Sequence, residues 1–372
     1  MNTEAETIKQ AVLAYIDTYR GETAPDAAFN TLAMQVFAYQ FKFNLPYRKY
    51  AQSKRQTPLL VQDWQQLPLM PINGYKTCTL SATPITADEP VFMSSGTTDA
   101  AHLSRNYHPT FASWDASMKY PFKHYVMPDC DRMTIIGLFP GANQNPNSSL
   151  SRYVTKALEY FGDDHSQILV NEQGLLYPEI VAALTTAVAE KRPVMLLGAS
   201  FSYVHLFDYL TQHHCQFRLP IGSRVFDTGG FKGQSRTVAQ QDLFTAIKDK
   251  LGIGRNYYLN MYGMTEICSQ CYDQNLQNLA AGQAVNYRKQ APAWVRVQIL
   301  DPDRLTSVPF GQTGLIAYYD LANWNSCVGI LTEDLGIADE TGFEILGRVS
   351  GAAAKGCSIS IDQLVAAQTH KE

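Results

Sequence analysis

The spacing of apolar residues changes along the chain. Residues 4–56 carry apolar side chains at helical spacing, as in LAMQVFAYQF, so this segment predicts helices. The stretch PLLVQDWQQLPLMPINGYK is interrupted by prolines and predicts an extended connector. From residue 91 short apolar runs alternate with helical patterns, whereas after residue 290 the pattern is one of short strands and turns.

The alternating segment has the order expected of a parallel sheet. The runs MTIIGLF, PVMLLG and SRVFDTGG predict buried strands, and VAALTTAVAEK and VAQQDLFTAIKDKL predict the intervening helices. Each predicted strand ends at a loop of small residues. In α/β folds of this kind ligands bind at the carboxyl ends of the strands, so we expect the site on these loops.

These patterns divide the chain into regions. We expect a helical region and connector at residues 1–90, an α/β core at 91–290, a small β-rich unit at 291–360 and a tail at 361–372. The β-rich unit is indicated by WVRVQIL, GLIAYYDL and GFEILGR. A chain of 372 residues is longer than one compact core usually holds, so the predicted fold is α/β with more than one subdomain.

Composition and charge exclude several classes of partner. The chain is 45% hydrophobic and its net charge is −4, which argues against nucleic acid. No apolar run approaches the ~20 residues of a membrane span, and the acidic start does not resemble a secretory signal. Seven cysteines, an odd number, suggest reduced thiols. We therefore expect a cytoplasmic protein without a membrane partner; the oligomeric state stays open.

The stretch FMSSGTTDAAHLSR places small hydroxyl residues around a glycine, directly after an apolar run. It contains Ser94, Ser95, Gly96, Thr97 and Thr98, and none of these side chains is charged. Such a cluster is common in ordinary turns. It could equally hold a phosphate, because backbone N–H groups and hydroxyls can bind an anion without a fixed countercharge.

The stretch NMYGMTE follows the strand-like RNYYL. Tyr262 offers a flat ring, Thr265 a hydroxyl and Glu266 a carboxylate that could hold Mg²⁺. The alternative is a structural strand end. CSQC, two residues further on, is a lone C-x-x-C and does not by itself predict zinc.

Three further loops could contact a nucleotide. In LTEDLG we place Asp334 after a strand, where it could accept from ribose hydroxyls, and Arg348 ends GFEILGR. Either residue could instead belong to a surface pair near a turn. Gly229 and Gly230 in DTGGFKG permit close backbone approach to a flat ligand, but the stretch lacks the ending of a phosphate-binding P-loop.

The order of SSGTT, TGG, YGMTE, TED and GR resembles the adenylate-forming superfamily. That superfamily includes acyl-CoA synthetases, adenylation domains of peptide synthetases and beetle luciferases. Upstream, NLPYRKY and DWQQLPLMPINGYK are similar to the branch that holds phenylacetate-CoA ligases and the acyl-protein synthetases of bacterial bioluminescence. The resemblance covers residues 32–360 and implies the large N-terminal domain of that fold: two α/β subdomains and a β-rich unit.

The resemblance implies a role for each motif. The hydroxyl loop would grip the β- and γ-phosphates of ATP, and Gly229 and Gly230 would lie beside adenine, with the Tyr262 ring against it. Thr265 would contact the α-phosphate, Glu266 would bind Mg²⁺, and Asp334 with Arg348 would bind the ribose. The implied reaction is attack of a substrate carboxylate on the α-phosphorus, giving acyl-AMP and pyrophosphate.

The chain also departs from the family pattern. Asp99 replaces a usual glycine, and no lysine follows soon after the hydroxyl loop. Val349 replaces the hinge residue, and we expect the mobile C-terminal domain with its catalytic lysine to be absent. KGCS resembles the cysteine that takes the acyl group in bioluminescence acyl-protein synthetases, so Cys357 is either that acceptor or a structural thiol. Lys355 could activate it or replace the missing lysine.

The sequence leaves two classes of carboxylic acid as the substrate, aryl acids and fatty acids. A short adenylating protein of phenazine-antibiotic biosynthesis resembles this chain in length, and we expect an aryl acid that a partner reductase converts to an aldehyde. Aromatic residues where the family places its acyl pocket favour this class: Phe201, Tyr203, Phe231, Tyr257 and Tyr258. The alternatives are a fatty-acyl-protein synthetase acylated on Cys357 and a non-catalytic nucleotide- or acyl-binding protein.

Overall fold

The computed structural model describes residues 2–94, 103–229, 235–236 and 238–349. The chain forms two compact units. The terminal unit comprises Met1–Met118, Thr265–Gln270 and Gln290–Glu372, and the central unit comprises Lys119–Met264 and Cys271–Lys289. The N-terminal helical region and the late β-rich region, which differ in sequence pattern, therefore share one unit.

The terminal unit begins with helices, as the apolar spacing predicts. They are α1 (Thr3–Thr18), α2 (Asp26–Phe43) and α3 (Leu45–Ser53). Asn44 ends α2 and its side chain accepts a hydrogen bond from the Tyr47 backbone at 3.2 Å, which starts α3. The connector holds only short elements: η1 (Trp64–Gln66), β1 (Met70–Pro71) and α4 (Gly74–Thr77).

The same unit holds an antiparallel sheet. Its strands are β13 (Val295–Leu300), β14 (Thr313–Asp320), β15 (Gly329–Asp339) and β16 (Gly342–Arg348), with the short helix η4 (Leu321–Asn323) after β14 and β1 parallel to β15. The predicted strands after residue 290 are confirmed. The placement of Asp334 after a strand was wrong: β15 continues through it, because β16 pairs with this part of the strand.

A two-stranded hairpin of β2 (Val91–Met93) and β3 (Arg105–Tyr107) flanks the hydroxyl loop. The helix that follows, α5 (Ala112–Pro121), runs on into the π-helical turn η2 (Phe122–Val126). The apolar run before the hydroxyl loop thus forms a strand, and a second strand follows the loop.

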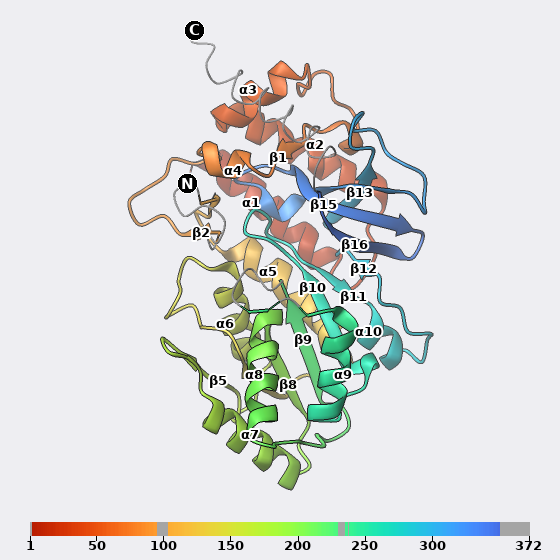
Figure 1. Cartoon of the computed structure of the whole chain (residues 1–372). Helices are drawn as coiled ribbons and strands as arrows, with labels where there is room; N and C mark the ends of the chain where they lie inside the picture. The colour runs from red at the N-terminus through yellow and green to blue at the C-terminus, as the bar shows by residue number, and fades with distance from the viewer. Residues whose placement is uncertain (1, 95–102, 230–234, 237, 350–372) are drawn as a thin grey trace. The chain divides into compact units, whose positions relative to one another are not determined.

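The central unit contains the predicted parallel sheet. Strands β4 (Thr134–Gly137), β8 (Val194–Ala199), β9 (Arg224–Thr228) and β10 (Tyr258–Tyr262) are parallel, with β5 (Gln167–Ile168) beside β4 and β11 (Cys271–Asp273) antiparallel beside β10. Figure 1 shows α8 and α9 side by side in front of β8 and β9. The α-helices that lie wholly in the described part of the unit are α6 (Ser149–Phe161), α7 (Tyr177–Ala189), α8 (Ser200–Gln212), α9 (Gln240–Leu251) and α10 (Asn275–Ala280). The unit also includes η2, β6 (Val170–Asn171), β7 (Gly174–Leu175) and η3 (Arg255–Tyr257). Strand β12 (Lys289–Gln290) lies at the unit boundary.

Burial of apolar side chains explains why the central unit folds in this order. Every residue of β8 is buried, as expected of a strand covered on both faces. Helix α7 buries Ile180, Leu184 and Ala187, which are spaced along one helical face. Polar loops then follow the carboxyl ends of the strands, where the candidate residues lie.

No helix within the described ranges is both long and apolar enough to cross a membrane.

Candidate functional site

In the terminal unit, the two ends of the predicted phosphate loop are held together. The Ser94 backbone N–H donates to the Ser104 carbonyl at 3.1 Å, and the Ser94 hydroxyl accepts from the Ser104 backbone N–H at 3.0 Å. These bonds continue the ladder of β2 and β3 and set where the loop leaves and returns. The remaining loop residues, Ser95, Gly96, Thr97 and Thr98, lie outside the described residues.

Glu266 lies in the same unit with a buried carboxyl group. The residue is 6% exposed, and burial raises the pKa of its carboxyl, whereas a hydrogen bond from the Ser104 side chain and the positive charges of Arg348 and Lys76 lower that pKa. Ser104 is thus shared between the loop end and the carboxylate. A desolvated carboxylate in this position is suited to a cation.

Thr265 precedes Glu266 in a segment without helix or strand. Its carbonyl accepts a hydrogen bond from the Asn106 amide of β3 at 3.2 Å. Because Asn106 also belongs to the hairpin that flanks the hydroxyl loop, the two motifs are joined through one strand.

Asp334 and Arg348 are opposite one another on β15 and β16. The Arg348 Nε lies 3.6 Å from the Asp334 Oδ1, with side chains 74% and 16% exposed respectively. The pair is solvated on its arginine side, so its contribution to folding is small. Its guanidinium is available to an anionic or hydroxyl-bearing ligand.

The adenine-side candidates lie in the central unit. Gly229 directly follows β9 and has a φ of +68°, a backbone conformation that favours glycine. Tyr262 ends the neighbouring β10 and is 8% exposed. The Thr228 hydroxyl donates to the Met261 carbonyl at 3.2 Å, which ties the two strand ends together. Gly230 lies outside the described residues.

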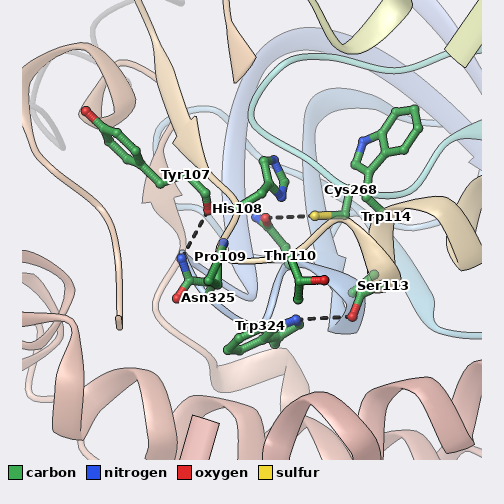
Figure 2. Close-up of a pocket in the computed structure, with 11 residues that line it drawn as sticks. Tyr107, His108, Pro109, Thr110, Ser113, Trp114, Cys268, Trp324 and Asn325 are labelled. Carbon is green, nitrogen blue, oxygen red and sulfur yellow. Dashed lines mark hydrogen bonds between the residues drawn. The ribbon is translucent and has the colours of Figure 1, made fainter. Parts of the chain in front are cut away.

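A second group of polar residues in the terminal unit lines a cavity of about 10 Å³. Its walls include Cys268, the first cysteine of CSQC, and Figure 2 shows hydrogen bonds of Trp324 with Ser113 and of Asn325 with Tyr107. This space holds about one water molecule. Cys268 itself is buried, and burial raises the pKa of its thiol well above the usual range, so the cavity is part of the packing rather than a substrate pocket.

Sequence comparison identifies the family. The profile of the LuxE acyl-protein synthetases matches residues 16–366. The chain belongs to the LuxE acyl-protein synthetase family. Two long-chain-fatty-acid–luciferin-component ligases are similar to this chain along most of their length. The ligase of Aliivibrio fischeri is 23% identical over 352 residues, which cover 90% of this chain and 88% of the relative. The ligase of Vibrio harveyi is 22% identical over 345 residues, which cover 91% of this chain and 88% of the relative.

Solved structures place this LuxE-family chain in the adenylate-forming fold. A 2-hydroxyisobutyryl-CoA ligase in the postadenylation state, in complex with 2-HIB-AMP, superimposes with a TM-score of 0.65 at 15% identity, covering 92% of this chain and 74% of the ligase. The same ligase in its thioesterification state gives 0.62 at 16% identity, covering 89% and 70%. The predicted superfamily and α/β fold are confirmed, and family membership makes the chain a ligase.

Sequence reasoning missed one buried polar cluster of the central unit. Asp227, at the end of β9, accepts hydrogen bonds from Tyr258 at 2.5 Å, Ser200 at 2.9 Å and the Asn260 side chain at 3.2 Å. Burial raises the pKa of its carboxyl to about 6. The available signal was a charged residue inside the apolar run VFDT, directly before the two glycines.

The proposed aromatic acyl pocket is only partly supported by residue placement. Tyr203 is buried and its hydroxyl donates to the Leu196 and Phe226 carbonyls, and Tyr258 is buried against Asp227. Tyr257 packs on the hydrophobic core of the central unit. Phe201 is partly buried beside Phe139, with ring centroids 6.2 Å apart. Among the described aromatic candidates, Tyr203 and Tyr258 are therefore structural.

The remaining candidates fall in parts of the chain that the structure leaves undescribed. Phe231, Asp99, Lys355 and Cys357 all lie outside the described residues. Within the described residues, no group of three or more His, Cys, Asp or Glu could hold a metal ion by itself. A cation at Glu266 would consequently need further ligands from the nucleotide phosphates and water.

Proposed function

We propose that this protein activates a fatty acid with ATP to give acyl-AMP and pyrophosphate, and then takes the acyl group on Cys357. The observation that carries the proposal is the buried Glu266 carboxylate, hydrogen-bonded to the end of the hydroxyl loop, in a chain of the LuxE acyl-protein synthetase family. The fatty-acid ligases among its relatives favour a fatty acid over the aryl acid that the sequence pattern suggested.

The charges around Glu266 suit a metal–nucleotide. Burial opposes ionisation of the Glu266 carboxyl, and Ser104, Arg348 and Lys76 favour it; a bound Mg²⁺ would favour it further. Mg²⁺ prefers one or two carboxylates together with phosphate oxygens, which matches a single glutamate beside a phosphate loop. When bound, the ion would neutralise charge on the phosphates.

The residues of the chain then have separate tasks. The hydroxyl loop with Ser94 at its base would hold the β- and γ-phosphates, Thr265 would contact the α-phosphate, and Asp334 with Arg348 would hold the ribose. In the central unit Gly229 and Tyr262 would enclose adenine. The carboxylate oxygen of the acid attacks the α-phosphorus, the bond to the β-phosphate oxygen breaks, and pyrophosphate leaves with its electron pair.

Transfer would follow by thioester formation. The Cys357 thiolate attacks the acyl carbonyl, the bond to the phosphate oxygen breaks, and AMP leaves. Lys355, two residues away, would lower the pKa of the thiol or serve as a catalytic lysine. A cytoplasmic acyl reductase would accept the acyl group and, with hydride from a reduced nicotinamide cofactor, release an aldehyde and free its thiol.

Pyrophosphate release is the direct test. The purified chain is incubated with ATP, Mg²⁺ and one acid at a time, from saturated fatty acids of increasing length to aryl acids of the phenazine type. We expect release with fatty acids, which stops in Glu266→Gln. Release with aryl acids alone would replace the proposed substrate, and ATP binding without release from any acid would indicate a non-catalytic binding protein.

A further inference from the structure

The segment from Thr265 to Gln270 carries Glu266 yet contains no helix or strand. In a buried segment of this kind the backbone N–H and C=O groups need other partners, because leaving them unpaired costs free energy. Here side chains supply those partners. They come from residues of β3, α5, β14 and η4 that belong to the terminal unit.

Asp320, the last residue of β14, holds the far end of the segment. Its buried carboxylate accepts from the Cys268 backbone N–H at 2.9 Å and from the Ser269 backbone N–H at 2.8 Å. The Ser269 hydroxyl donates to the same carboxylate at 2.7 Å, and so does the Ala322 backbone at 2.9 Å. One side chain thus fixes two consecutive amides of the segment and the first turn of η4.

Asn323 holds the end that carries Glu266. Its amide donates to the Glu266 carbonyl at 3.0 Å and to the Cys327 carbonyl at 2.9 Å. Its amide oxygen accepts from the Cys268 thiol at 3.3 Å. The Glu266 carbonyl and the backbone that follows it are consequently tied to one turn, the four residues from Asp320 to Asn323.

Other side chains complete the arrangement. Asn106 donates to the Thr265 carbonyl at 3.2 Å and to the Asn323 amide oxygen at 3.4 Å. Ser117 donates to the Cys268 carbonyl at 2.8 Å, and the Tyr318 hydroxyl donates to the Ser269 carbonyl at 3.0 Å. Gln40 of α2 donates to the Asn323 carbonyl at 3.0 Å and so anchors the turn to a helix.

We propose that the turn from Asp320 to Asn323 is a positioning device that fixes the backbone of the 265–270 segment and thereby aims the Glu266 carboxylate at the metal–nucleotide. The proposal rests on the proposed function, since it assigns no ligand of its own. Asp320 and Asn323 are positioning residues: they touch the backbone of the segment and not the reacting atoms. Supports of this kind typically change metal affinity by about 10- to 100-fold.

The test uses Asn323→Asp in the full chain, with Asn325→Asp as a matched control. Asn323→Asp keeps the size of the side chain and removes the N–H donors to the Glu266 carbonyl. Asn325 is two residues away and also buried, but its amide donates to the Ser81 hydroxyl at 3.1 Å and the Tyr107 carbonyl at 3.0 Å. The control therefore loses comparable hydrogen bonds without releasing the segment.

Calorimetric binding of ATP is measured with Mg²⁺ and, separately, with EDTA. We expect the Mg²⁺-dependent increase in ATP affinity to fall about tenfold in Asn323→Asp, with the affinity in EDTA unchanged and Asn325→Asp like the wild type. Hydrogen exchange should also become faster at the backbone amides of the 265–270 segment in the Asn323→Asp protein alone. If that variant does not fold, Asp320→Asn, which weakens the acceptor for the Cys268 and Ser269 amides, takes its place with the same expectation.

Other results would overturn the proposal. If a folded Asn323→Asp protein kept the full Mg²⁺-dependent increase in ATP affinity, the turn would not aim Glu266. An equal loss of ATP affinity in Mg²⁺ and in EDTA would show a general structural effect. A wild-type protein without any Mg²⁺-dependent increase would overturn both this inference and the metal role of Glu266. Intact Mg²⁺-dependent binding without pyrophosphate release would contradict the proposed function alone.

Discussion

Glu266 combines a buried carboxyl group with a hydrogen bond from Ser104, and its proposed role is to bind a cation. Replacing it with glutamine keeps the shape and the contact with Ser104 but removes the negative charge. We expect pyrophosphate release to fall at least about 100-fold, because a lost charge contact to the reacting phosphates typically costs about 3 kcal/mol of transition-state stabilisation. Glu340→Gln, at an exposed turn of the same unit, is the control and should keep full activity. Equal activity in the two variants would refute the metal role.

Asp227 is the second residue whose environment makes a measurable prediction. The pKa of its buried carboxyl is about 6 in the folded chain, above the value of about 3.9 in an unfolded chain. The folded protein therefore binds the proton more tightly, and this group's contribution to stability is lost as the pH rises through 6. Asp227→Asn lacks the titration, so its free energy of unfolding relative to wild type should increase by about 1 kcal/mol from pH 5 to pH 7.5. Urea unfolding at both pH values measures it, and a constant difference would contradict the raised pKa.

The Asp334–Arg348 pair on β15 and β16 allows an effect on nucleotide binding to be told apart from an effect on stability. Because the Arg348 side chain is 74% exposed, Arg348→Ala should change the free energy of unfolding by less than about 1 kcal/mol. If the guanidinium contacts the nucleotide, the KM for ATP should nevertheless rise about tenfold, with a smaller rise in Arg348→Lys. Steady-state kinetics and urea unfolding of the same preparations provide both numbers. An unchanged KM would leave the residue as a surface partner of Asp334.

At the level of elements, the spacing of apolar residues predicted the regular helices and strands. The strands β4, β8 and β9 and the helices α7 and α9 follow from apolar spacing, because a helix pairs its own backbone groups and a strand pairs those of its neighbours in the sheet. The 265–270 segment could not be predicted in this way. Its conformation depends on Asp320 and Asn323, more than fifty residues later in the chain. No local pattern reveals hydrogen bonds over such a separation.

For the whole molecule, the order of short motifs was more informative than any one of them. The superfamily followed from five weak motifs in sequence, and the LuxE profile over residues 16–366 agrees with it. Aromatic composition alone did not define an acyl pocket, since Tyr203 and Tyr258 are core residues whose hydroxyls bind within the protein. Burial, which decides between a core tyrosine and a pocket wall, depends on tertiary packing and not on residue type.

Covalent acyl transfer is the second step of the proposed function and can be tested on intact protein. On this proposal Cys357 attacks acyl-AMP only after the acid has been activated, so a thioester should appear with ATP and a fatty acid together and with neither alone. Mass spectrometry should show the mass of the acid minus one water, removable by neutral hydroxylamine. Cys357→Ala should lose this adduct yet release pyrophosphate in a single turnover, because adenylation precedes transfer. Cys215→Ala, at a partly buried cysteine of the central unit, should keep both. An adduct that persists in Cys357→Ala would assign the acceptor to another residue, and activation without any adduct would mean that acyl-AMP itself is handed on.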